Sequence, residues 1–390
     1  MRLKALRAPR SADFRSPVHD ARVVARVGVL LGSAVVVLFL TGLLSHLHQH
    51  PVAWLPLGPA PSWGYRLTQG VHVGVGLACV PLLLAKLYAA YPRLFERPAL
   101  RGARHALERA SVAVLVAATT FQVVTGVLNV FQVYPWRFSF VRVHYAVAWV
   151  VLGSVLVHVG VKLPTIVAAL RTAVDDEPEA PTVEPAAGAT RRGFLAAVAA
   201  TTLGVVALTV GQTVRPLAPF AVLAPRDPRV GPQGLPVNKT ARSAGVEQTA
   251  ADPAWRLGLS GPAGERSLSR DELVALGLVR AVVPIACVEG WSATATWDGV
   301  RVRDLAGLVG GTGREDVRVE SLQEGGSYRE STLPAAYVAA DDTLLALRLA
   351  GADLDLDHGF PARVVAPNRP GVLQTKWVSR IVVLPAGDAA

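Results

Sequence analysis

Cysteine and charged residues are scarce in this chain of 390 residues. Only two cysteines occur, and Asp, Glu, Lys and Arg together make up 17% of the residues. Because Cys79 falls in a long apolar run and Cys287 in a more polar region, no internal disulfide is expected. The hydrophobic content of 51% and the mean hydropathy of +0.37 exclude an ordinary soluble chain.

The apolar residues are gathered in long runs that are nearly free of charge. Each run is close to the roughly 20 residues with which a helix crosses a bilayer. The runs cover residues 27–45, 70–91, 110–131, 143–163 and 194–215. From about Pro216 onward, short β-branched stretches are broken by Gly, Pro and Asp, which is typical of a soluble domain. The predicted organisation is a four-helix transmembrane domain (1–170), a cytoplasmic linker (171–193), a fifth span (194–215) and a soluble domain (216–390).

The distribution of Lys and Arg indicates the orientation of the spans. Basic residues are concentrated before the first span and between the second and third spans, whereas the connections 46–69 and 132–142 hold only Arg66, Arg137 and Arg142. Since cytoplasmic loops near spans carry an excess of Lys and Arg, we expect the soluble domain to lie outside the cytoplasmic membrane. The formal net charge of +10 then follows largely from topology. The predicted partner is therefore the lipid bilayer, with no nucleic acid.

The linker ends in the motif TRRGFL, residues 190–195. The motif resembles a twin-arginine export signal, which lets a domain cross the membrane already folded, although the Lys that usually follows is absent. Paired arginines before a span also serve as positive-inside charge, and both interpretations stay open. An export signal would indicate that the soluble domain acquires a bulky cofactor in the cytoplasm.

Two histidines stand at opposite ends of the apolar stretch HYAVAWVVLGSVLVH. The 14 residues from His144 to His158 advance a helix by about 1400°, about 40° short of four turns, and by about 21 Å. Both imidazoles therefore share one face near opposite membrane surfaces, as two stacked haems in a helical bundle require. His72 in the second span is level with His144, while His19 and His105 are alternative partners for His158.

The positions of these histidines resemble those of the bacterial di-haem cytochrome b family, the membrane subunits of formate dehydrogenases and nickel–iron hydrogenases. The resemblance covers roughly residues 15–170. It implies two b-type haems that exchange electrons with quinone or quinol. The implied iron ligands are His19, His72, His144 and His158, with His105 as an alternative to His19.

Cys287 ends an apolar stretch of the soluble domain and is followed by a polar turn, in PIACVEGWS. A free cysteine is usually buried as a small apolar residue. At the end of a core strand, however, a thiolate can also be presented to a metal. The sequence alone therefore leaves a structural and a metal-binding interpretation of Cys287.

The same region resembles the sulfite oxidase superfamily of molybdenum–molybdopterin enzymes, and most of all its methionine sulfoxide reductase catalytic subunits. The motifs are CVEGWS (287–292), WDGVRVRDL (297–305) and HGFPARVVAPNRPGVLQTKWVSRIVV (358–383), within a likeness over about residues 235–385. The resemblance implies a mixed α+β molybdopterin domain after the transmembrane bundle. The fold class expected for the whole chain is therefore an α+β membrane protein.

Site residues follow from this resemblance. It implies that Cys287 binds molybdenum, that Glu289 is a catalytic acid beside the metal, and that Asn238 in PVNKTA lies near it. The cofactor phosphate calls for cationic donors, which cluster in the last motif as Arg363, Arg369, Lys376 and Arg380. Of these four, we predict that Arg363 and Lys376 bind the cofactor.

The transmembrane half and the soluble half of the sequence together predict a membrane-bound molybdopterin-dependent oxidoreductase. Electrons would pass between the quinone pool and an outer molybdenum site through b haems, and the enzyme would reduce a small or protein-bound sulfoxide, or another S- or N-oxide. One alternative is the oxidation of sulfite, with electrons passing to quinone. The stretch EGWSATATW after Cys287 holds none of the arginines that a sulfite anion calls for, which favours the reductase. A second alternative is a non-catalytic membrane haem protein with an outer binding domain.

Overall fold

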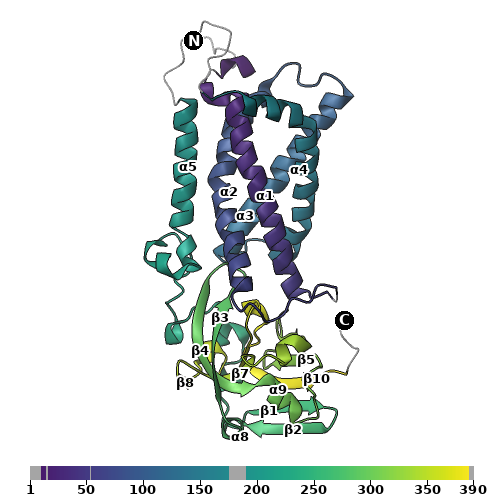
Figure 1. Ribbon diagram of the computed structural model, residues 1–390, viewed down its shortest axis with the longest axis vertical. Helices are drawn as coiled ribbons and strands as arrows, with labels where there is room; N and C mark the ends of the chain where they lie inside the picture. The colour runs from purple at the N-terminus through teal and green to yellow at the C-terminus, as the bar shows by residue number, and fades with distance from the viewer. Residues whose placement is uncertain (1–9, 15, 53, 175–189, 386–390) are drawn as a thin grey trace, which may run out of the picture. The chain divides into compact units, whose positions relative to one another are not determined.

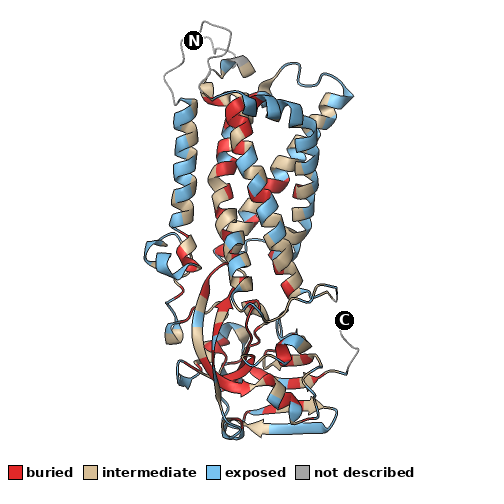
Figure 2. Cartoon of the chain, viewed as in Figure 1, coloured by how far each residue is buried: buried red, intermediate tan, exposed pale blue. Residues whose placement is uncertain are grey.

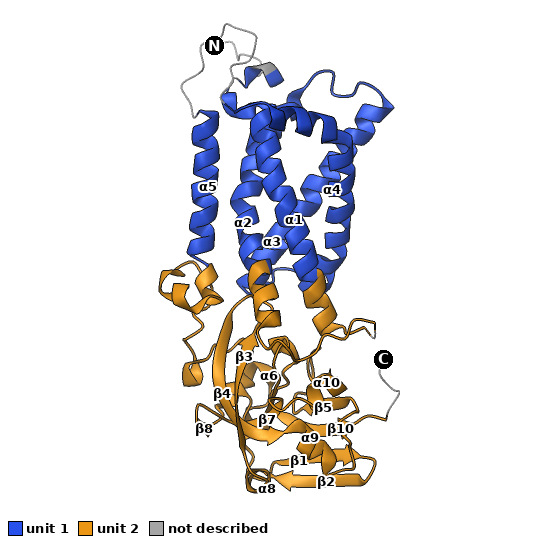
Figure 3. Cartoon of the chain, in the orientation of Figure 1, with its two compact units in different colours: residues 1–42, 72–209 blue, residues 43–71, 210–390 orange. Residues whose placement is uncertain are grey.

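The computed structural model describes residues 10–14, 16–52, 54–174 and 190–385. Most of the predicted linker, residues 175–189, lies outside the described residues. Two compact units divide the chain, as Figure 3 shows. Unit 1 comprises Met1–Gly42 and His72–Thr209, and unit 2 comprises Leu43–Val71 and Val210–Ala390. The connector between the first two spans thus belongs to the same compact unit as the carboxyl-terminal half.

Long apolar helices make up unit 1, and two of them extend into unit 2 (Figure 1). They are α1 (Ala21–Gln49), α2 (Gly64–Ala90), α3 (Ala103–Val130), α4 (Phe140–Arg171) and α5 (Arg191–Ala207). Among the described residues, five helical segments are long and apolar enough to cross a membrane, the last of them Arg191–Gln212. The predicted amino-terminal bundle with a fifth apolar helix is confirmed.

Exposed residues lie along the helices (Figure 2), and many of them are large apolar side chains. Leu30 and Leu156 are 55% and 65% exposed, whereas the hydroxyl-bearing Thr125 is only 2% exposed. A helix satisfies its own backbone hydrogen bonds, so leucine side chains can face lipid while polar side chains gather inside the bundle. This arrangement suits a bilayer.

The carboxyl-terminal half of the chain, as far as the structure describes it, contains two sheets of five strands each. The first has the order β2-β1-β10-β5-β6, in which only β1 and β10 are parallel; the second has the order β3-β4-β7-β8, with β9 also paired to β7. The strands are β1 (Arg256–Gly261), β2 (Gly264–Ser269), β3 (Val279–Ala286), β4 (Ser292–Arg301), β5 (Val317–Ser321), β6 (Glu330–Leu333), β7 (Leu344–Leu349), β8 (Ala352–Asp353), β9 (Arg363–Val365) and β10 (Val378–Val383). Short helices connect them: α6 (Ala241–Ala244), α7 (Glu247–Ala251), α8 (Arg270–Ala275), α9 (Val302–Gly307) and α10 (Ala335–Val338). The predicted mixed α+β domain is confirmed.

Strand β7 lies at the centre of this half because both of its faces are buried. Leu345 and Leu347 join the core shared with the first sheet, while Leu344 and Ala346 face a second apolar cluster. Alternation of side chains along the strand produces this division. Cys287 belongs to the second cluster, at the end of β3, so the core of the domain fixes its position.

Candidate functional site

Cys287 begins the tight turn that joins β3 to β4. Its backbone N–H donates to the Trp291 carbonyl at 2.9 Å, and the Gly290 N–H donates to the Cys287 carbonyl at 3.0 Å. Gly290 has a φ of 95°, which favours glycine at this position. These bonds hold the turn closed and fix the backbone from which the thiol projects.

Asn238 connects the three polar side chains of the site. Its Nδ2 lies 2.8 Å from Cys287 Sγ and 2.6 Å from Glu289 Oε2, and its Oδ1 accepts a hydrogen bond from Trp291 Nε1 at 3.1 Å. The indole N–H can only donate, so it fixes which end of the amide faces the thiol. The structure therefore brings together Asn238, Cys287 and Glu289, three of the site residues that the resemblance implied.

Burial and negative charge shape the chemistry of the thiol. Cys287 is 4% exposed, and burial, followed by the adjacent charge of Glu289, raises its pKa well above the ordinary value. Binding to a soft metal ion would deprotonate such a thiol. Burial raises the pKa of Tyr328, and the negative charges of Cys287 and Glu289 raise it further. This phenol is therefore within electrostatic range of the site. Sequence reasoning missed Tyr328, which no motif marks.

Arg363 and Lys376 form a cluster of cations, in which Arg363 is buried and Lys376 is half-buried. Arg363 is 5% exposed and donates from Nη1 to the His358 carbonyl at 3.1 Å, while Lys376 Nζ donates to the Asp357 carbonyl at 2.8 Å. Burial lowers the pKa of Arg363 to about 10, and burial followed by the charge of Arg363 lowers the pKa of Lys376 to about 7. Within the described part of the chain, neither side chain has an ion-pair partner. An anion such as a phosphate would supply the missing charge.

Lys239 links this cluster to the cysteine site. Its carbonyl accepts a hydrogen bond from Lys376 Nζ at 2.5 Å, and its own Nζ bonds to Gln323 Oε1. Because Lys239 directly follows Asn238, the two groups of residues meet in one loop. The adjacency within PVNKTA was the signal that could have identified Lys239.

A family model for the oxidoreductase molybdopterin binding domain matches residues 243–388. This segment is therefore a molybdopterin-binding oxidoreductase domain, and sulfite oxidases are among the proteins similar to it. The match includes Cys287, Glu289, Arg363 and Lys376, while Asn238 precedes it.

Known proteins of several kinds are similar to the chain. A nitrate reductase of Hordeum vulgare is 37% identical over 103 residues, which cover 24% of this chain and 12% of that protein. A sulfite oxidase of Arabidopsis thaliana is 34% identical over 113 residues, covering 24% and 29%. A protein of Azospira oryzae named as a protein-methionine-sulfoxide reductase subunit, YedZ1, is 30% identical over 131 residues, covering 33% and 49%. The chain thus spans half or less of each of these relatives.

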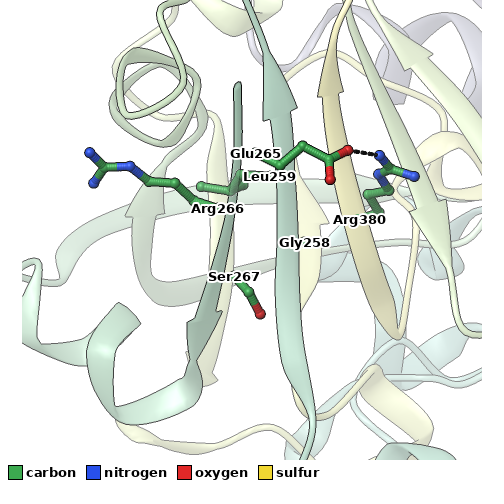
Figure 4. A pocket seen from close by; sticks show the side chains of 6 residues that line it. All are labelled: Gly258, Leu259, Glu265, Arg266, Ser267 and Arg380. Atoms are coloured by element: carbon green, nitrogen blue, oxygen red, sulfur yellow. Dashed lines mark hydrogen bonds and ion pairs between the residues drawn. The ribbon is translucent and has the colours of Figure 1, made fainter. Parts of the chain in front are cut away.

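The other two cations of the last motif do not join the cofactor-type cluster of the molybdopterin domain. Arg369 is 3% exposed and donates to the carbonyls of Leu373 and Thr332 at 3.2 and 2.6 Å. Arg380 pairs with Glu265 at 2.6 Å (Figure 4). This pair lines a surface pocket whose other residues are Gly258, Leu259, Arg266 and Ser267. Neither Cys287 nor the buried cations belong to that pocket.

In unit 1, the outer pair of predicted haem ligands converges. The rings of His72 and His144 lie 6.3 Å apart between centroids and are inclined by 71°. Thr41 Oγ1 lies 3.0 Å from His72 Nδ1, and Thr125 Oγ1 lies 3.3 Å from His144 Nδ1. Since the threonines engage the Nδ1 atoms, the two Nε2 atoms are available for another ligand.

The inner histidines have different surroundings. His19 Nδ1 lies 3.3 Å from the Ala89 carbonyl, and its ring contacts the rings of Phe14, Tyr88 and Tyr91. His158 is in α4. Over the residues that the structure describes, no ring contact joins His19 to His158. The alternative ligand, His105, accepts a hydrogen bond from the Arg101 N–H at 3.2 Å near the start of α3.

Proposed function

We propose that the protein is a membrane-bound molybdopterin-dependent oxidoreductase that exchanges electrons between the quinone pool and an outer molybdenum site through b haems. The observation that carries this proposal is the junction of Asn238, Cys287 and Glu289 at the end of β3. In this role the Cys287 thiolate would bind molybdenum, and bound molybdenum would supply two-electron oxygen-atom chemistry. The substrate that we propose is a sulfoxide or another S- or N-oxide, either small or protein-bound.

The chain's own residues hold the site in place and supply protons. Asn238 keeps the thiol and the carboxyl of Glu289 at a fixed separation by bonding to both. Removing oxygen from a sulfoxide consumes two electrons and two protons and releases water. We assign proton transfer to the Glu289 carboxyl group, since its Oε2 accepts a hydrogen bond from the Asn238 amide beside the thiol.

The buried cations fit the phosphate of a molybdopterin. Arg363 Nε is buried without a hydrogen-bond partner among the described residues, and the adjacent Lys376 Nζ donates to the backbone carbonyls of Lys239 and Asp357 and not to a carboxylate. Gly359 has a φ of +109°, and a Cβ on it would lie 3.0 Å from Lys376 Cβ and 3.1 Å from Arg363 Cβ. A glycine therefore allows the two cationic side chains to leave the backbone close together. We assign the phosphate to Arg363 and Lys376.

The outer histidine pair fits a bis-histidine b haem. When two imidazoles bind one metal ion from opposite sides, each metal–nitrogen bond is about 2 Å long. Adding the distance from the nitrogen to the centre of each ring places the two ring centroids about 6 Å apart. The 6.3 Å between the rings of His72 and His144 agrees with this value. We assign a second haem to His158 and keep His19 and His105 as alternative partners. Haem iron transfers one electron at a time, so the haems would connect quinol to a two-electron site.

For the location, we propose a cytoplasmic membrane with the molybdopterin domain on the outer side. The basic residues flanking the spans support this orientation. Arg191 of the twin-arginine motif pairs with Asp20 at 3.2 Å, so this arginine also has a structural contact in the folded protein. Replacing Arg191 and Arg192 with Lys keeps the charge and tests export. If the domain then stays accessible to protease from outside, the motif is not an export signal.

The direction of electron flow separates the two catalytic hypotheses. Sulfite oxidation would favour arginines facing the substrate, but the turn after Cys287 carries none, and the nearby buried Arg363 is assigned to phosphate. The Azospira oryzae relative, named as a subunit of a methionine sulfoxide reductase, also favours reduction. We therefore place the sulfite-oxidising enzyme second and the non-catalytic haem protein third.

The decisive experiment uses the purified full-length protein with its haems reduced by dithionite and the excess removed. Adding methionine sulfoxide should reoxidise the haems, and the Cys287→Ser variant should not respond. Reduction of the oxidised haems by sulfite, without reoxidation by sulfoxide, would establish the reverse direction. A protein that contains haem and responds to neither compound would favour the non-catalytic alternative.

A further inference from the structure

Within unit 2, the first two turns of α2 contact the turn that carries Cys287. Gln69 donates from Nε2 to the Val288 carbonyl at 2.6 Å. The Gln69 side chain is only 5% exposed, so this bond lies away from water. Val288 stands between Cys287 and Glu289, and Gln69 therefore holds the backbone between the thiol and the carboxyl.

Asn368 fixes the start of the same helix on the molybdopterin domain. Its Oδ1 accepts the Tyr65 N–H at 2.6 Å, and its Nδ2 donates to the Gly58 carbonyl at 2.7 Å. The Asn368 N–H donates to the Ser62 carbonyl at 3.3 Å. One buried side chain and its backbone thus bind the connector at three points, which fixes where Gln69 lies.

Two glycines allow this close approach. A Cβ on Gly64 would lie 2.8 Å from Asn368 Oδ1, and a Cβ on Gly70 would lie 2.5 Å from Thr213 Cγ2. Thr213 in turn donates from Oγ1 to the Gly290 carbonyl. The cysteine turn is therefore held from two sides, by Gln69 at Val288 and by Thr213 at Gly290.

We propose that Gln69 is a positioning residue for the molybdenum site, supplied by the connector between the first two spans. This inference rests on the proposed function for the role of the metal, but the geometry involves only the chain's own residues. Loss of the Gln69 donor would leave the Val288 carbonyl without this partner and loosen the turn. Cys287 and Glu289 would then lose their fixed relation to Asn238. Residues next to metal ligands commonly affect metal affinity or activity by about 10–100-fold.

The test replaces Gln69 with Met, which keeps the length of the side chain and removes the donor. Arg66→Gln is the matched control, because Arg66 is on the same helix and bonds to Thr294 Oγ1 at 3.3 Å, outside the cysteine turn. Full-length protein is made without molybdate, and maleimide labelling of the Cys287 peptide is followed by mass spectrometry. We expect labelling up to about 10-fold faster in Gln69→Met, because the net contribution of one hydrogen bond can shift the opening of the turn by about that factor, and unchanged labelling in Arg66→Gln.

A second arm uses protein made with molybdate. Gln69→Met should lose about 10–100-fold in molybdenum affinity or kcat, and Gln69→Lys, which restores a donor, should recover part of the loss. If Gln69→Met does not accumulate, Gln69→Leu removes the same donor with a shorter side chain and replaces it in both arms. Wild-type labelling and wild-type molybdenum retention in these variants would overturn the positioning role. Absence of molybdenum from the wild-type protein would instead refute the proposed function, while the labelling result would still decide whether Gln69 holds the turn.

Discussion

The helices of unit 1 and the sheets of unit 2 bury opposite kinds of side chain. In the sheets, leucines such as Leu257 and Leu345 are fully buried, whereas in the helices Leu30 and Leu156 are exposed and Thr125 is buried. Each unit nevertheless gathers polar side chains at one site: imidazoles and threonines in unit 1, and a thiol, an amide and a carboxyl in unit 2. Under the proposed function, each unit would hold its own cofactor with ligands drawn from its own residues.

Because the proposed molybdenum and haem ligands are different residues, the largest expected effect is a loss of activity without a loss of haem. Cys287→Ser should reduce sulfoxide turnover by more than about 100-fold, because a harder hydroxyl replaces the soft thiolate ligand itself. Losing a residue that only supports a metal ligand costs up to about 100-fold. The haem absorbance should stay at the wild-type level. Activity assays and visible spectra of the same preparation check both halves. Loss of haem together with activity would contradict the independence of the two units.

The reciprocal prediction concerns unit 1. His144→Ala should remove the haem assigned to the outer pair, because one of its two facing imidazoles is lost. Molybdenum content should be unchanged, and activity should persist with a reduced dye but not with quinol. His50→Ala is the matched control, since His50 faces His46 at 4.6 Å outside the pair. An unchanged haem spectrum in His144→Ala would exclude the assigned ligand.

A smaller effect is expected at Asn238. Asn238→Ala removes the bonds to Cys287 and Glu289, and should lower kcat by about 10–100-fold while the thiolate still binds metal. Steady-state kinetics normalised to molybdenum content measure this change. Asn129→Ala is a control in α3, where the amide bonds only to Tyr134 among the described residues. Wild-type kcat in Asn238→Ala would mean that the amide merely fills space.

The smallest effect is a pH dependence of stability and of cofactor affinity that comes from Lys376. Burial lowers the pKa of Lys376 from 10.5 to about 7. Between these values the unfolded state binds a proton that the folded, cofactor-free state does not, so the stability of that form should rise with pH. Phosphate requires the charged ammonium, so cofactor affinity should fall above about pH 7, by at most about tenfold per pH unit.

Lys376→Met should flatten both of these profiles. Thermal unfolding of the cofactor-free protein and molybdenum retained after ultrafiltration, each followed from about pH 6 to about pH 9, measure them. A wild-type slope in the variant would assign the titration to another group.

The sequence predicted the elements whose signals are local. Long apolar runs predicted the helices, and the motif CVEGWS identified the turn after β3, because both depend on neighbouring residues. The spacing of His144 and His158 predicted one helix face, but the partner of each histidine depends on how separate helices pack. His72 meets His144, whereas His19 packs among aromatic rings.

Contacts between distant segments could not be read from the sequence. Gln69 and Val288 are 219 residues apart, and Tyr65 and Asn368 are 303 residues apart. No periodicity connects such positions, and the connector had the composition of an interfacial loop. Neighbours in sequence can also separate: Arg380 follows Lys376 by four residues, yet its strand directs it to the exposed face beside Glu265.

Metal analysis of the purified full-length protein tests the central claim most directly. The protein is produced in cells that make molybdopterin, and molybdenum and haem iron are counted per chain in wild type and in Cys287→Ser. We predict one molybdenum per wild-type chain, strongly reduced molybdenum in Cys287→Ser, and equal haem iron in both. A folded wild-type protein that carries haem iron and no molybdenum would contradict the account.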